Sequence, residues 1–62
     1  MDFKSLVIMT TAEVADYLRV HPATVYKLLR RHDIPAIKVG SDWRFNKHEL
    51  DKWLAQKTLQ PR

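Results

Sequence analysis

The stretch that decides the fold is TTAEVADYLRVHPATVYKLLRR, residues Thr10 to Arg31. It opens with Thr-x-x-Glu at Thr10 and Glu13, a capping box in which the hydroxyl and the carboxylate each bond a backbone amide at a helix start. Apolar residues then follow at helical spacing. These signals predict a first helix over residues 11–19.

A second helix is predicted to begin at Pro22. Proline cannot continue the first helix, but its fixed φ suits the first position of a new one. Val25, Leu28 and Leu29 form an apolar stripe along this helix. The residues on or beside its opposite, outer face are Ala23, Thr24, Tyr26, Lys27, Arg30 and Arg31.

A helix, a short break and a cationic helix form the arrangement of a helix-turn-helix, whose second helix enters the major groove of DNA. Pro22 to Arg31 carries three cations and no acid, whereas the first helix holds Glu13 and Asp16. This asymmetry favours a docking surface for a polyanion. The alternative is a solvated helix face with no partner.

The next stretch, IKVGSDWRF at residues 37–45, contains the single glycine of the chain. Its apolar residues alternate with polar ones, as in a half-buried β-hairpin. A three-residue loop, Gly40-Ser41-Asp42, pairs Val39 with Trp43 and gives all the apolar side chains of the hairpin one core face. We therefore expect the three-residue loop, because a two-residue loop would set an isoleucine against an arginine.

In that register Lys38 lies directly across from Arg44 on the outer face of the hairpin. Like charges at such positions cost up to ~1 kcal/mol in an isolated sheet. A phosphate beside them would turn the cost into an attraction. Screening by salt is the alternative explanation for the pair.

The pattern Asn-x-x-Glu at Asn46 and Glu49 predicts the start of a third helix. The fold class expected is mainly α with a small β-hairpin, a winged helix-turn-helix domain over residues 10–57. Residues 1–9 either precede the core or pack on it, and residues 58–62 are expected to fray.

The composition limits the classes of protein to consider. The chain has 62 residues, no cysteine, a net charge of +4 and a pI near 9.8, which favours a polyanionic partner. No apolar run is long enough for a signal peptide or a membrane span. We expect a soluble, cytoplasmic protein.

Enzyme chemistry has little support in the sequence. His21, His32 and His48 fall in three different predicted elements, and no metal-ligand pattern connects them. No nucleophile with a base, phosphate-binding glycine loop or acidic pair stands out. We expect no catalysis, no cofactor and no metal.

Together these short motifs resemble the excisionase-type branch of the MerR-like winged helix-turn-helix domains. The resemblance runs from about Met9 to Leu54, over the motifs T-x-x-E-x-A-x-x-L, T-V-Y-K-L-L-R, I-P-A-I-K-V-G, W-R-F and L-x-x-W-L. It implies a DNA-binding module whose second helix reads the major groove while the hairpin serves as a wing. The resemblance also implies a bacterial or phage origin. Two features depart from the family pattern: His21 replaces a small polar residue at the start of the second helix, and Ser41 and Asp42 replace arginines at the wing tip.

The resemblance also implies which residues contact DNA. Helix contacts are expected from Ala23, Thr24, Tyr26, Lys27, Arg30 and Arg31. Wing contacts are expected from Lys38, Gly40, Ser41 and Arg44, and backbone contacts at the first helix start from Thr10 and Thr11.

The function expected is sequence-specific binding of double-stranded DNA by a monomer. The family implies transcription regulation, control of recombination direction beside a recombinase, or service as one domain of a longer regulator. One alternative is a protein-interaction adaptor that uses Tyr26, Trp43 and Ile8 as an apolar patch. A second alternative is RNA binding, which would need exposed aromatic residues on a sheet.

Overall fold

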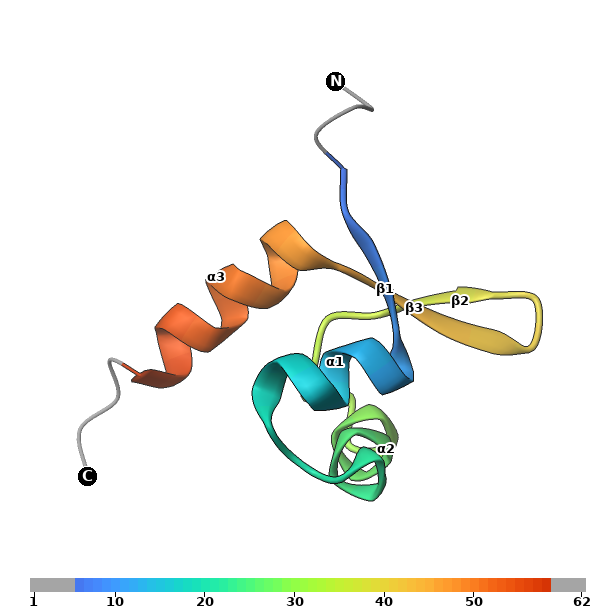
Figure 1. Cartoon of the computed structure of the whole chain (residues 1–62), viewed down its shortest axis with the longest axis horizontal. Coiled ribbons are helices and arrows are strands. Elements are labelled where there is room, and N and C mark those ends of the chain that lie inside the picture. The colour runs from blue at the N-terminus through green and yellow to red at the C-terminus, as the bar shows by residue number, and fades with distance from the viewer. Residues whose placement is uncertain (1–5, 59–62) are drawn as a thin grey trace.

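The computed structural model describes residues 6–58 as three helices and a three-stranded antiparallel sheet (Figure 1). The elements are β1 (Ile8–Thr10), α1 (Thr11–Leu18), α2 (Pro22–Arg30), β2 (Ile37–Val39), β3 (Asp42–Asn46) and α3 (Lys47–Thr58). This is a small winged helix-turn-helix fold, as predicted. Residues 1–5 and 59–62, which hold most of the predicted terminal segments, lie outside the described residues.

One strand adds to the predicted architecture. β1 pairs with β3, so the sheet order is β1-β3-β2, with Met9 opposite Phe45 and Thr10 opposite Arg44. The strand leads directly into α1. The β2–β3 hairpin, called the wing below, projects away from the helices, and α2 lies beside α1 (Figure 1).

The start of α1 has the predicted capping box in both halves. The amide of Thr10 donates to Glu13 Oε1 at 2.8 Å, and the amide of Glu13 donates to Thr10 Oγ1 at 3.1 Å. Two of the amides that a helix start leaves without an intrahelical partner are satisfied in this way.

The first two helices end in the same way. The amide of Val20 donates to the carbonyl of Ala15 at 2.9 Å, and the amide of Asp33 donates to the carbonyl of Leu28 at 3.0 Å. Each bond closes a Schellman motif around a left-handed residue, Arg19 with φ 59° and then His32 with φ 54°. Glycine usually occupies such positions, so the sequence gives no direct signal for these ends.

The core joins all three helices to the sheet. Its buried residues are Val14, Ala15, Val25, Leu29, Ile34, Phe45 and Leu50. Leu18, Leu28, Trp43 and Trp53 pack against this cluster while partly exposed. The predicted apolar stripe of α2, Val25, Leu28 and Leu29, is therefore the packed face of that helix.

The predicted hairpin register is wrong. The loop has two residues, Gly40 and Ser41, and the cross-strand pairs are Ile37 with Arg44, Lys38 with Trp43, and Val39 with Asp42. Gly40 has φ +63°. Of the two loop residues, only Gly40 has a positive φ. This pattern fits a type II′ turn, whose twist matches that of the flanking strands.

The register correction changes both faces of the wing. Ile37 and Val39 are 51% and 58% exposed instead of joining the core. Lys38 shares a face with Trp43, so Lys38 and Arg44 lie on opposite faces and no like-charge pair forms. Favourable turn geometry outweighs the burial of two aliphatic side chains.

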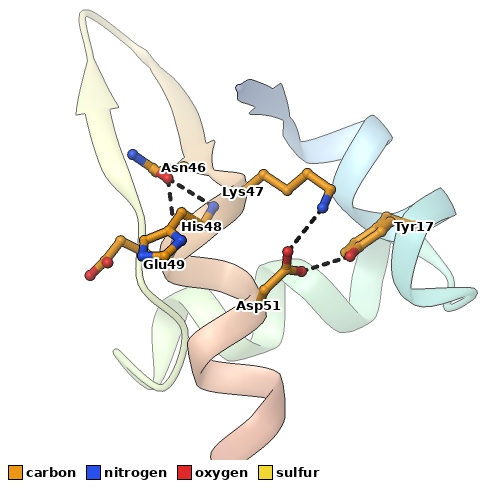
Figure 2. A network of polar contacts seen from close by, with 6 residues as sticks. All are labelled: Tyr17, Asn46, Lys47, His48, Glu49 and Asp51. Atoms are coloured by element: carbon orange, nitrogen blue, oxygen red, sulfur yellow. Dashed lines mark hydrogen bonds and ion pairs between the residues drawn. The ribbon is translucent and has the colours of Figure 1, made fainter. Parts of the chain in front are cut away.

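A polar cluster fastens α3 to α1 (Figure 2). The hydroxyl of Tyr17 donates to Asp51 Oδ1 at 2.6 Å, and Lys47 Nζ donates to Asp51 Oδ2 at 2.9 Å. These hydrogen bonds hold the pKa of Asp51 below its ordinary value, with the Tyr17 bond the larger cause. The hydrogen bond to Asp51 likewise raises the pKa of Lys47.

The predicted cap of α3 is present. Asn46 Oδ1 accepts from the amides of His48 at 2.9 Å and Glu49 at 3.4 Å. In Figure 2 the carboxylate of Glu49 points away from Asn46, and it lies 3.6 Å from Lys52 Nζ. The capping box is thus formed on the asparagine side.

Candidate nucleic-acid interface

The outer face of α2 is open to solvent. Its exposed residues are Ala23, Thr24, Tyr26, Lys27 and Arg30, followed by Arg31 at the helix end. The opposite face buries Val25 and Leu29 in the core. All six residues predicted for the second helix are therefore available to a ligand, and none of them is acidic.

The cations of α2 lie in its last turn and just beyond it. Positive side chains near a helix C-terminus interact favourably with the helix dipole, so part of this arrangement stabilises the helix itself. The first turn has no acidic residue, although an acid would be favoured there by the same dipole. The whole exposed length of α2 is thus left neutral or positive.

A hollow of about 380 Å³ separates α2 from the wing. It is lined by Thr10, Thr11, Ala12, Tyr26, Ser41, Asp42, Trp43 and Arg44. Five of the residues predicted from sequence as contacts come together here, from the start of α1, from α2 and from the wing. Gly40 lies in the turn of the wing, directly before Ser41, which lines the hollow.

The two cations of the wing are held differently. Lys38 Nζ lies 5.0 Å from the centroid of the Trp43 ring, a distance at which a cation is attracted to the aromatic face. Arg44 donates from Nη1 to the carbonyl of Trp43 at 2.8 Å and lies 3.9 Å from a carboxylate oxygen of Asp42. Lys38 therefore stays at the exposed surface, whereas Arg44 is half-buried and pairs with an acid of its own strand.

Such a surface suits a rod of negative charge better than a small molecule. A convex cationic helix next to a projecting hairpin offers contacts at two separated places, and the hollow between them is open and polar. Within residues 6–58 no group of three or more His, Asp or Glu side chains is arranged to hold a metal ion. In the same residues each helix falls short of the length and apolarity needed to cross a bilayer.

Sequence reasoning missed three contacts of this region. The Lys38–Trp43 contact and the Asp42–Arg44 pair both depend on the wing register, for which the glycine at position 40 was the available sequence signal. The third is the cap of α2, where His21 Nδ1 accepts from the amide of Ala23 at 3.0 Å. Histidine is not among the preferred N-cap residues, so its type did not reveal this role.

Comparison with known proteins identifies the class. A family described as "Helix-turn-helix domain" matches residues 8–58, and the chain belongs to this family.

Two curated proteins of Mycobacterium tuberculosis are similar to the chain. They are named "Putative DNA-binding protein Rv0500A" in strain ATCC 25618 / H37Rv and "Putative DNA-binding protein MT0521" in strain CDC 1551 / Oshkosh. Each is 43% identical over 37 residues, which cover 60% of this chain and 47% of the relative. The match thus spans about half the length of these relatives. No solved structure gives a significant match.

Proposed function

We propose that this chain binds double-stranded DNA through α2 and the wing. In this proposal the outer face of α2 enters the major groove, with Lys27 and Arg30 toward base edges and Arg31 toward the backbone. The hollow beside the wing receives a phosphate near Thr10, Thr11 and Arg44, while Lys38 contacts the backbone separately. Backbone contacts set the position and base contacts select the sequence.

The observation that carries the proposal is an acid-free, exposed face on the second helix of a helix-turn-helix. The names of the two mycobacterial relatives support the same activity. The linked motifs further support the excisionase-type branch of the MerR-like domains, with a role in transcription regulation or recombination. One such module binds weakly, so tandem sites, a protein partner such as a recombinase, or further domains supply additional affinity.

A salt titration tests the proposal. For duplex DNA, log K falls with log salt by about 0.9 per phosphate neutralised. Lys38→Ala is expected to weaken all sequences about equally and to lower this slope by about 1, whereas Arg30→Ala reduces the discrimination between sequences. Lys52→Ala is the matched control, because Lys52 is an exposed lysine on α3 that pairs with Glu49.

Two outcomes would contradict the proposal. If affinity for duplex DNA does not depend on salt, the proposed phosphate contacts are absent. If Lys38→Ala leaves the salt slope unchanged, the proposed contact from the wing is absent. Preference for single-stranded RNA would favour the RNA alternative, although the outward sheet face carries aliphatic and polar residues instead of aromatic ones. The adaptor alternative loses its proposed patch, because Ile8 and Trp43 lie on opposite sheet faces.

A further inference from the structure

His21 is placed at the end of α2 that the major groove would receive. It is the N-cap residue, with φ −68° and ψ 143°, and its side chain is exposed. In helix-turn-helix proteins the N-terminal residues of the second helix contact base edges. The inference therefore rests on the proposed DNA binding and concerns which residue reads the sequence.

The capping hydrogen bond fixes the hydrogen-bonding character of the imidazole. Nδ1 accepts from the amide of Ala23 at 3.0 Å, so Nδ1 carries no proton. A neutral imidazole then carries its proton on Nε2, which is a donor. The first α2 position is Pro22, which has no amide hydrogen, and the amide of Thr24 donates to the carbonyl of His21 at 2.9 Å. The cap thus holds the ring by its Nδ1 edge and leaves Nε2 on the other edge.

Nε2 has no competing partner in the part of the chain that the structure describes. Within residues 6–58 no group accepts a hydrogen bond from it, whereas Arg44 on the wing is engaged by Trp43 and Asp42. A ring fixed by a cap loses little rotational freedom on binding. The donor is therefore oriented before DNA arrives.

We infer that His21 is a specificity-determining residue that donates from Nε2 to a guanine in the major groove. Guanine presents two adjacent acceptors there, N7 and O6, while adenine presents an acceptor beside a donor and thymine an acceptor beside a methyl group. One donor therefore meets no opposing hydrogen at guanine. A small polar residue at this position could accept the hydrogen bond from the amide of Ala23 but would be too short to reach a base. Histidine therefore caps the helix and also offers a donor to DNA.

His21→Asn separates the two roles of this residue. The Oδ1 atom of asparagine can replace Nδ1 as the cap acceptor, since asparagine is a preferred N-cap residue. It lacks a donor at the Nε2 position. Bound sequences are selected from random duplexes with wild type and His21→Asn, and the base preferences are compared.

The expected result is loss of a guanine preference at one position, by about three- to tenfold, with the preferences due to Lys27 and Arg30 retained. The salt slope stays unchanged, because the contact is to a base and not to a phosphate. In the preferred site, 7-deazaguanine at that position weakens wild type but does not weaken His21→Asn further. Circular dichroism and thermal melting of His21→Asn match wild type.

Other outcomes overturn the inference. Identical preferences in wild type and His21→Asn would reduce His21 to a cap, especially if His21→Ala alone lowers affinity. Equal weakening of all sequences would make the contact a backbone one. If wild-type protein shows no salt-dependent duplex binding, the proposed function itself fails, and this is distinguishable because wild type is measured first.

Discussion

Asp42 limits what the wing can contribute to binding a polyanion. Its side chain is 69% exposed, it lines the hollow beside α2, and it lies 3.9 Å from Arg44. Lys38 and Arg44 supply two positive charges and Asp42 removes one, so the wing has one net positive charge. A partly exposed pair at this distance has a small interaction energy, and a phosphate that approaches Arg44 can take the place of Asp42. Lys38 is therefore the stronger candidate for the wing contact.

Gly40 is the residue at which backbone conformation limits the choice of side chain. A Cβ atom there would meet nothing within 4 Å, but the φ of +63° disfavours any L side chain. Gly40→Ala is expected to lower the free energy of unfolding by about 1–2 kcal/mol, measured by urea denaturation.

The matched control for Gly40 uses the opposite chirality. D-alanine at position 40, introduced by chemical synthesis, favours positive φ and restricts the unfolded chain. We expect stability equal to or above that of wild type. Equal losses with D- and L-alanine would contradict the type II′ turn and the two-residue loop.

At the scale of the element, the helix starts were predictable and the wing register was not. Thr10, Pro22 and Asn46 each act through local chemistry, so their positions follow from a few neighbouring residues. The register of the hairpin depends on two competing terms, the turn geometry at Gly40 and the burial of apolar side chains. Alternation alone favoured burial, and the turn geometry proved the stronger term.

The candidate interface likewise has features that were predictable from the sequence and features that were not. The exposure of the α2 face followed from helical periodicity, because the apolar stripe fixes which side faces outward. The role of His21 as a cap and the contact of Lys38 with Trp43 depend on side-chain geometry across a turn and across two strands. Residue type and spacing do not specify such contacts. The contribution of residues 8–10 as a third strand was also missed, because three residues are too few for a clear period.

The contact between α1 and α3 gives a prediction on pH. Since the folded pKa of Asp51 is below its ordinary value of 3.8, the carboxylate stabilises the fold above about pH 4, and this contribution is lost as pH falls through the folded pKa. Asp51→Asn should lower the melting temperature at pH 7. The difference from wild type should shrink toward pH 2.5, as thermal melts across this range would measure.

At alkaline pH the contact between α1 and α3 is expected to lose stability as pH rises, because Lys47 loses its proton. The folded pKa of Lys47 is above its ordinary value of 10.5, so the stability that Lys47 contributes is present below that pH and is lost as pH rises further.

Glu49→Gln is the control for Asp51→Asn, because Glu49 forms an exposed pair with Lys52 on the same helix. A gap between Asp51→Asn and wild type that is as large at pH 2.5 as at pH 7 would refute the role of the carboxylate.

At the scale of the whole molecule, stability is the limiting quantity. A chain of 62 residues buries a smaller fraction of its surface than a larger domain does. At ~0.05–0.15 kcal/mol per residue its free energy of unfolding is about 3–9 kcal/mol. The seven buried core residues found within residues 6–58 therefore allow few losses, and the exposed outer face of α2 can vary at little cost to the fold.

Substitution of Phe45 tests how strongly the stability of the domain depends on its core. It is fully buried on the central strand of the sheet, opposite Met9. Phe45→Ala is expected to cost about 3–5 kcal/mol, enough to unfold much of the population at 37 °C, whereas Phe45→Leu should leave a folded domain with a lower melting temperature. Tyr26→Ala is the matched control, because Tyr26 is an aromatic residue that is 46% exposed on α2. It should melt close to wild type while binding duplex DNA more weakly, and a Phe45→Ala melt within a few degrees of wild type would show that the core does not depend on this strand.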